Sequence, residues 1–173
     1  EQRPDIIYIF SKDILRHRRA QKEDAVWLKK GEEYKDETLR VRAFGSTDVG
    51  VSFLLQAGGK KIFHAGDLNN WHWMDESTEA EWKGAEKNFL HELDDLYAYT
   101  PEVDVALFPV DPRLGKEYMR GAGQFVTKIK THIFVPMHFT PEYAKANAFR
   151  DIAEAHEVRF VSLTHRGQKI EIE

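Results

Sequence analysis

The sequence predicts a single α/β domain in which helices pack on a mixed β-sheet. In the second half of the chain, short apolar strands alternate with helical segments, an order typical of layered α/β domains. In the first half, short runs rich in β-branched and aromatic residues predict several strands. The 173 residues suffice for about one domain. Since the chain contains no internal repeat, low-complexity segment or linker, we assign residues 1–173 to one unit.

The first half of the chain is predicted to be mostly β-structure. Each run is short and is bounded by polar or turn-forming residues. The predicted strands are residues 5–10, 25–28, 37–44, 50–56 and 60–64. The last two flank Gly58-Gly59, a dipeptide that favours the tight turn of a β-hairpin.

Helices and strands alternate in the second half. Residues 78–97 form a strongly amphipathic segment, which Thr78 and Glu81 begin with a capping box. Residues 103–110 are continuously apolar, as expected of a strand that is covered on both faces. The remaining predictions are helices at 118–130 and 141–156 and strands at 132–137, 158–163 and 169–172.

Composition excludes several classes of function. The chain has 25 basic and 29 acidic residues, a net charge of −4 and no basic stripe, which argues against a nucleic-acid-binding protein. It has no cysteine, so disulfides, thiolate zinc sites and cysteine nucleophiles are excluded and any transition metal must use His, Asp or Glu. No signal peptide or membrane-length apolar run is present, so we expect a cytoplasmic protein.

Asp67 is the first candidate metal ligand. The strand at 60–64 runs into Ala65-Gly66-Asp67, and Gly66 allows a sharp turn at the strand end. That turn would leave the Asp67 carboxylate projecting from the rim of the sheet. An Asx-turn or a helix cap explains the same residue equally well.

His138 and Asp48 are the other two candidate ligands. His138 ends the apolar strand at 132–137, although a core histidine bonded to backbone would look the same. Asp48 precedes the hairpin and has the alternative role of a turn carboxylate. Carboxylate and imidazole ligands suit Zn²⁺, Mn²⁺ or Fe. The three residues do not, however, have the spacing of a local metal-binding motif.

Four further residues lie near these candidates in the sequence. His64 and His72 flank Asp67, and each is either a ligand or a packing residue. Asp111 and Arg113 follow the buried strand at 103–110, and we predict that they pair with each other at the sheet rim.

Five stretches together resemble the metallo-β-lactamase fold superfamily of metallo-hydrolases. They are Y-I-F-S-K-D-I (8–14), S-T-D-V-G-V-S-F (46–53), I-F-H-A-G-D-L-N-N-W-H-W (62–73), F-P-V-D-P-R-L-G (108–115) and P-M-H-F (136–139). The resemblance implies a four-layer αβ/βα sandwich with one or two metal ions, usually zinc, with Mn or Fe as alternatives. It also implies that Asp67 bridges the metals and that His138 is the last ligand. Asp48, or else Ser46 or Thr47, takes the place of a histidine usual in the family.

One departure from the family pattern is large. The H-x-H-x-D-H loop, which supplies most of the ligands in the family, is absent from this sequence. The resemblance therefore implies that the chain is the C-terminal two-thirds of the domain, incomplete at its N-terminus and inactive alone. We expect a complementing N-terminal fragment or self-association to cover the sheet edge and apolar face that such a piece exposes.

The resemblance implies metal-dependent hydrolysis of a small-molecule substrate. The alternative is a non-catalytic binding or scaffold protein with the same fold and a degenerate metal site. A nucleic-acid-processing hydrolase is disfavoured by the acidic charge balance.

Overall fold

The computed structural model describes residues 6–17, 23 and 25–171 of the chain. Its strands are β1 (Ile9–Ser11), β2 (Val26–Leu28), β3 (Glu33–Lys35), β4 (Leu39–Phe44), β5 (Ser52–Ala57), β6 (Lys60–His64), β7 (Glu102–Pro109), β8 (Lys130–Met137) and β9 (Arg159–Phe160). Its α-helices are α1 (Glu79–Tyr99), α2 (Arg120–Lys128), α3 (Tyr143–Asn147) and α4 (Arg150–Ala155), with 3₁₀ helices at Lys12–His17 and Pro112–Glu117. The α/β class predicted from the sequence is confirmed.

Seven of these strands form one mixed sheet in the order β3-β4-β5-β6-β7-β8-β9. The neighbours from β3 to β6 are antiparallel, and those from β6 to β9 are parallel. Strands β1 and β2 form a separate parallel pair. The hairpin predicted around Gly58-Gly59 is β5–β6, and both glycines have positive φ angles.

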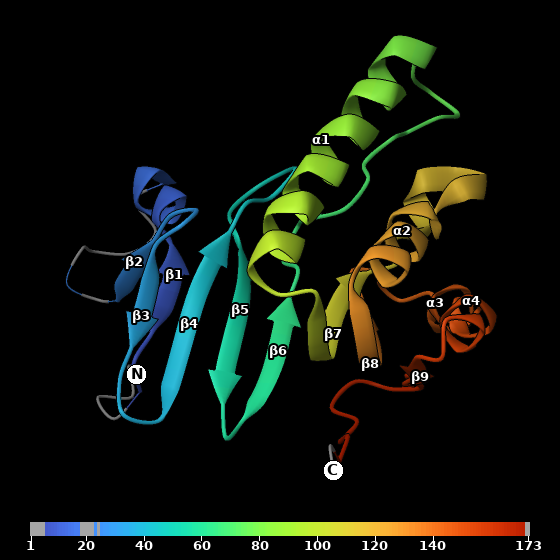
Figure 1. Ribbon diagram of the computed structural model, residues 1–173. Coiled ribbons are helices and arrows are strands. Elements are labelled where there is room, and N and C mark those ends of the chain that lie inside the picture. The colour runs from blue at the N-terminus through green and yellow to red at the C-terminus, as the bar shows by residue number, and fades with distance from the viewer. Residues whose placement is uncertain (1–5, 18–22, 24, 172–173) are drawn as a thin grey trace.

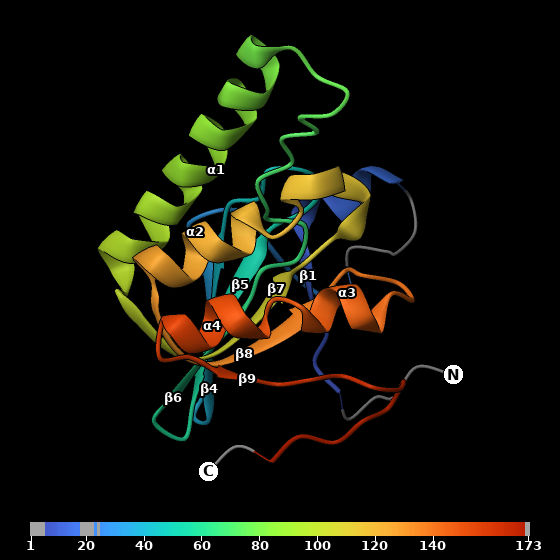
Figure 2. The same ribbon diagram turned by 90° about the vertical axis from the view of Figure 1, so that its right-hand side faces the viewer.

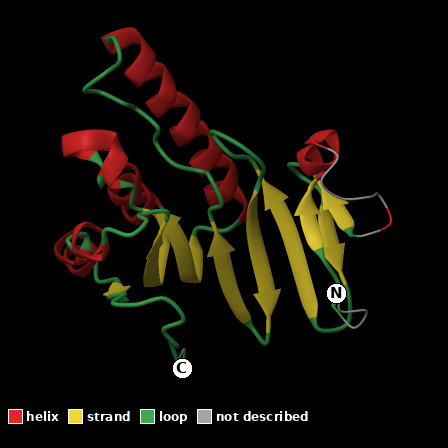
Figure 3. Cartoon of the chain, turned by 180° about the vertical axis from the view of Figure 1, so that it is seen from behind, coloured by secondary structure: helices red, strands yellow, loops and turns green. Residues whose placement is uncertain are grey.

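The two faces of the seven-stranded sheet are covered differently. Helices α1 to α4 lie over one face (Figures 1 and 2), where the core includes the fully buried rings of Phe63, Phe108, Phe125 and Phe134. On the other face, β1 and β2 pack against β4 and β5. The chain after β9 packs against β7 and β8 on that same face. This is the side of the sheet that faces the viewer in Figure 3. Among the described residues, no helix combines the length and apolar character that crossing a membrane requires.

Helix α1 begins where the sequence predicts. The Thr78 side chain accepts a hydrogen bond from the Glu81 backbone N–H, and the Glu81 carboxylate accepts one from the Thr78 N–H, which completes the predicted capping box. Phe89, Leu93 and Leu96 of the predicted apolar face are fully buried. This face fixes α1 on the sheet beside the loop that carries Asp67.

Several predicted boundaries were wrong. Strand β3 was missed because its sequence, Glu33-Tyr34-Lys35, is charged and largely exposed at the sheet edge. The helix predicted at 141–156 is two helices, and Phe149 in the break between them is fully buried against Phe134.

The terminal strand predictions also need correction. Within the strand predicted at 5–10, residue 5 lies outside the described residues and β1 begins only at Ile9. Residues 169–171 are not a strand, and residue 172 lies outside the described range. Ile170 packs its side chain against the second face of the sheet, so this segment covers the sheet without pairing with it.

Candidate metal centre

Three neighbouring parallel strands end at the same edge of the sheet, and each is followed by a polar side chain. Asp67 follows β6, Asp111 follows β7 and His138 follows β8. The carboxyl ends of parallel strands are where α/β folds commonly bind their ligands. The topology therefore brings together side chains that are far apart in the sequence.

Asp67 and His138 meet directly at this edge. His138 Nε2 lies 3.3 Å from Asp67 Oδ1, with the side chains 32% and 35% exposed. A charge-assisted N–H···O bond would be shorter, at about 2.7–2.9 Å. Two ligands on a tetrahedral zinc ion, each bound at about 2.0–2.2 Å, lie about 3.3–3.5 Å apart. The spacing of these two donor atoms therefore fits two adjacent positions in the coordination shell of one metal ion.

The orientation of the His138 ring is fixed by Asp111. Asp111 Oδ2 lies 2.8 Å from His138 Nδ1, and the Asp111 side chain is 1% exposed. Because a carboxylate only accepts hydrogen bonds, Nδ1 must carry the proton. Nε2 faces Asp67, and in the neutral imidazole with its proton on Nδ1 it is the nitrogen that can bind a metal. A carboxylate that holds the second nitrogen of a metal-binding histidine is the usual arrangement around such ligands.

Arg113 keeps the buried Asp111 ionised. Its Nη2 lies 2.5 Å from Asp111 Oδ2, and its Nε lies 3.0 Å from both carboxylate oxygens. Burial raises the pKa of Asp111, but the hydrogen bonds from Arg113 and His138 outweigh it and hold that pKa below its ordinary value. The predicted rim pair between Asp111 and Arg113 is thus present, and Asp111 also contacts the His138 ring.

Trp71 connects the two candidate ligands. Its Nε1 donates a hydrogen bond of 2.8 Å to the backbone carbonyl of Asp67, and its ring centroid lies 5.3 Å from that of His138. The indole therefore holds the Asp67 turn and packs beside the imidazole. Trp71 was not predicted to take this role. Its position four residues after Asp67, within one loop, was the available signal.

The backbone adopts left-handed conformations at Gly66, directly before Asp67, and at His138. Gly66 has a φ of 57°, and a Cβ there would lie 2.9 Å from the Val51 carbonyl oxygen, so only glycine fits. His138 has a φ of 65°, which is uncommon for a residue with a side chain and is concentrated at functional sites.

Asp48, the third predicted ligand, is exposed in the loop before β5. Its neighbour Thr47 braces the Asp67 loop, because the Thr47 hydroxyl donates to the Asn69 carbonyl at 2.6 Å and accepts from the Asn69 N–H at 3.0 Å. In the described part of the chain, no three His, Asp or Glu side chains are grouped as a metal-binding cluster. Ligation by Asp48 stays a prediction.

The two histidines flanking Asp67 have local structural partners. His72 is 1% exposed, and its ring nitrogens contact the Glu117 carbonyl and the Met74 N–H, each at 3.1 Å. His64 Nδ1 accepts a hydrogen bond from the Gly66 N–H at 3.1 Å. Although part of the His64 side chain is exposed, burial of the remainder lowers the pKa of its imidazole.

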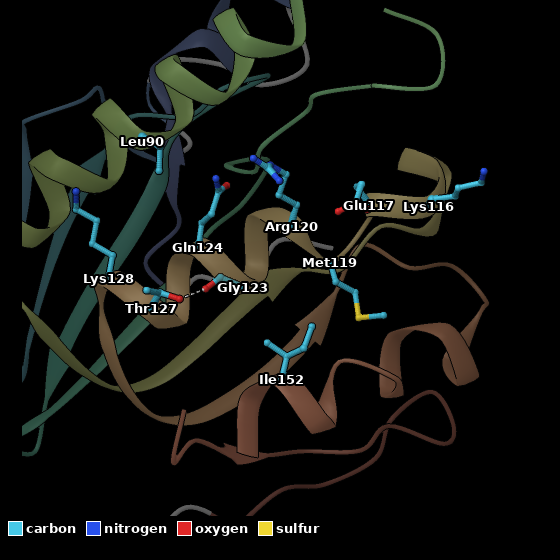
Figure 4. Close-up of a pocket in the computed structure, with 10 residues that line it drawn as sticks. All are labelled: Leu90, Lys116, Glu117, Met119, Arg120, Gly123, Gln124, Thr127, Lys128 and Ile152. Carbon is cyan, nitrogen blue, oxygen red and sulfur yellow. Dashed lines mark hydrogen bonds between the residues drawn. The ribbon is translucent and has the colours of Figure 1, made fainter. Parts of the chain in front are cut away.

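A wider groove on the helical side does not belong to this centre. It measures about 620 Å³ and lies among α1, α2 and α4 (Figure 4), with Leu90, Gln124 and Ile152 among its lining residues. No candidate ligand lines it. His138 lines two cavities, one of about 310 Å³ that it shares with Asp111 and Arg113, and one of about 600 Å³ that extends towards the C-terminal segment.

Comparison with solved structures identifies the fold. A protein classed as a metal-dependent hydrolase from Parabacteroides distasonis matches 92% of this chain and 65% of its own, with 14% identity and a TM-score of 0.63. The metallo-hydrolase Igni18 from the archaeon Ignicoccus hospitalis matches 91% of this chain and 65% of its own, with 16% identity and a TM-score of 0.59. The metallo-β-lactamase fold protein YhfI from Bacillus subtilis matches 86% and 58%, with 6% identity and a TM-score of 0.52.

The chain therefore has the metallo-β-lactamase fold, as the sequence resemblance implied. It spans about two-thirds or less of the length of these structures. No protein-family model and no curated protein sequence matches the chain. The structural neighbours are described as metal-dependent or metallo-hydrolases, or by the fold itself.

Proposed function

We propose that this chain carries part of the metal centre of a hydrolase that acts on a small-molecule substrate, with zinc held by Asp67 and His138. The observation that carries the proposal is the 3.3 Å separation between Asp67 Oδ1 and His138 Nε2. A carboxylate oxygen and an imidazole nitrogen are a donor pair that zinc accepts readily, and manganese or iron also accepts it. We also propose Asp48 as a further ligand.

A zinc ion held there would supply Lewis-acid activation of water and stabilisation of the developing oxyanion. The residues of this chain would prepare the centre for that chemistry. Asp111 accepts a hydrogen bond from His138 Nδ1, which leaves Nε2 as the nitrogen that would bind the metal. Trp71 holds the Asp67 turn and packs beside the His138 ring.

Two protein donors leave a zinc ion under-ligated, since zinc sites in proteins use three or four protein ligands. We therefore propose that this chain alone has little hydrolase activity and that a complementing N-terminal fragment supplies further ligands. Self-association is the competing arrangement. Light scattering with chromatography tests whether the chain needs a complementing fragment or self-association. A monodisperse, cooperatively folded monomer of this chain alone would contradict both arrangements.

Zinc titration calorimetry tests the metal centre. The wild-type chain should bind zinc, while Asp67→Ala and His138→Ala should abolish the measured heat. His132→Ala is the matched control, because His132 Nε2 lies 2.6 Å from the Glu102 carboxylate in another exposed imidazole–carboxylate pair. Equal heats in all four proteins, measured with the complementing N-terminal fragment present, would refute the proposed centre.

The second candidate function is a non-catalytic binding protein that keeps the fold. It is favoured by the lack of any three-residue metal cluster in the described part of the chain. The two functions differ in their response to a complementing fragment. Zinc affinity that increases when an N-terminal fragment is supplied supports the hydrolase, and affinity that stays negligible supports the binding protein.

A further inference from the structure

We infer that Arg113 binds an anionic group, a carboxylate or a phosphate, of the molecule that enters the candidate metal centre. The inference rests on the proposed function for the location of the reacting group, and it adds the chemical class of the substrate. The observation behind it is that part of the Arg113 guanidinium does not bond to Asp111.

The pair between Arg113 and Asp111 is strongly asymmetric in exposure. The Asp111 side chain is 1% exposed, whereas the Arg113 side chain is 63% exposed. Asp111 occupies Nε and Nη2 of the guanidinium. Within the described residues Nη1 has no acceptor, so one edge of the fork remains open. A guanidinium fork matches the two oxygens of a carboxylate or phosphate.

The Arg113 guanidinium lies beside the candidate ligand His138. Arg113 Nη2 is 3.4 Å from His138 Nδ1. Both residues line the cavity of about 310 Å³, together with Phe139 and Thr140. This volume is at the lower end of the range of small-molecule sites, about 300–1,000 Å³. A small substrate would therefore place its anionic group within reach of the guanidinium.

The negative charges that face this cavity are already engaged. Asp111 is bound by Arg113 and His138. The other carboxylate in the lining, Glu142, lies 2.7 Å from Lys145 Nζ. The remaining polar side chain, Thr140, adds a hydroxyl that can donate to an anion. An incoming anion would thus meet a cation and a hydroxyl, with both acidic groups already paired.

The simpler reading is that Arg113 only braces Asp111. Bracing needs only the edge of the fork formed by Nε and Nη2, and it leaves Nη1 unused. The two readings differ in a measurable way, because only the anion-binding reading predicts that Arg113 responds to added anions.

The test is a titration of the metal-free chain with inorganic phosphate and, separately, with acetate, followed by NMR of arginine Nε–H and histidine ring resonances. We expect the signals of Arg113 and His138 to shift together. Arg113→Gln should weaken phosphate binding at least about tenfold, and Arg113→Lys, which keeps the charge that faces Asp111, should weaken it less. The tighter-binding anion identifies the group on the substrate.

Arg159→Gln is the matched control, since Arg159 is an exposed arginine on β9. Equal phosphate affinity in wild type and Arg113→Gln would overturn the inference, as would an equal loss in Arg159→Gln. Because the titration uses metal-free protein, its result does not depend on the proposed metal centre. Zinc binding that depends on Asp67 without anion binding at Arg113 refutes only this inference. Anion binding at Arg113 without zinc binding refutes the proposed centre.

Discussion

The loop after β6 joins two polar clusters that differ in how their hydrogen-bonding capacity is used. At Asp67 the loop meets His138 at 3.3 Å, longer than a good hydrogen bond, and both side chains are partly exposed. Three residues later, Asn70 is fully buried and donates to Glu86 and Gln124. The first cluster leaves the Asp67 and His138 side chains partly exposed, whereas in the second the Asn70 amide group donates to neighbours within the cluster.

The cluster at Glu86 is a structural clamp. Glu86 Oε1 lies 2.7 Å from Arg120 Nε and also accepts hydrogen bonds from Asn70 and Gln124. The bond from Arg120 is the largest reason that the pKa of Glu86 lies below its ordinary value. The clamp ties the loop to α1 and α2, so it supports the position of the candidate ligand Asp67. Rigid support of this kind is what a preorganised site requires.

The largest expected effect is the loss of metal binding in Asp67→Ala. Structural zinc sites bind with about 10–16 kcal/mol shared among four ligands, so one ligand contributes about 3 kcal/mol, or at least about 100-fold in affinity. Stability without metal should change by less than about 0.5 kcal/mol, because the carboxylate is partly exposed. Zinc titration and urea unfolding measure the two quantities. If Asp67→Ala lost much stability but kept its zinc affinity, Asp67 would be a structural residue and not a metal ligand.

The next effect concerns the residue behind His138. Asp111→Asn should weaken zinc binding about 10–100-fold, because a neutral amide no longer holds the His138 ring and its Nδ1 proton as firmly. Glu142→Gln is the control, since Glu142 lines the same cavity but pairs with Lys145. Similar affinities for both variants, measured by calorimetry, would show that Asp111 does not orient the ligand.

A smaller effect, on stability, is expected at the clamp. Glu86→Gln should lower the free energy of unfolding by about 1–2 kcal/mol, because it replaces charge-assisted bonds to Arg120 by neutral ones. Zinc affinity should remain within about twofold. Glu79→Gln on the same helix removes an exposed pair with Lys83 and should cost no more than about 0.5 kcal/mol. Equal losses in the two variants, in urea unfolding, would mean that the clamp is no stronger than a surface pair.

The sequence predicted the strands next to the candidate centre better than it predicted the contacts made there. The apolar run of β7 and the hairpin β5–β6 have strong local signals, and both were confirmed. The Asp111–His138 bond was not predicted, because it depends on β7 and β8 being parallel neighbours. Pairing between strands is non-local, so a single sequence does not specify which side chains meet. Asp67 and His138 were found through their positions at strand ends, and ligation itself stays a prediction.

The charged edge of the sheet shows where local patterning fails. Glu33-Tyr34-Lys35 has too few apolar residues to indicate a strand, yet it pairs with β4. Edge strands often carry charge, which limits unwanted pairing. The break between α3 and α4 was missed for a related reason: burial of Phe149 is decided by the packing of β8 and β9 beneath it.

The smallest effect is expected at Asp36, a third carboxylate, which lies outside both clusters and, among the described residues, bonds only to those near it in the sequence. Asp36 accepts from the N–H groups of Thr38 and Leu39, each at 2.8 Å, and from the Tyr34 hydroxyl at 2.9 Å. These bonds, led by that from Thr38, lower the pKa of Asp36 from 3.8 to about 2. Since the folded pKa is the lower one, the stabilisation is complete above about pH 4 and is lost as pH falls from 3.8 towards 2.

Urea unfolding between pH 2 and 6 measures this linkage. The difference in stability between wild type and Asp36→Asn should be constant above about pH 4 and should shrink below it. Asp151→Asn, an exposed residue on α4, is the control. A difference that is independent of pH would show that the turn bonds do not favour the ionised carboxylate. We expect a carboxylate with only local bonds, such as Asp36, to affect stability alone, whereas the partly exposed Asp67 is the candidate ligand whose loss should affect metal binding.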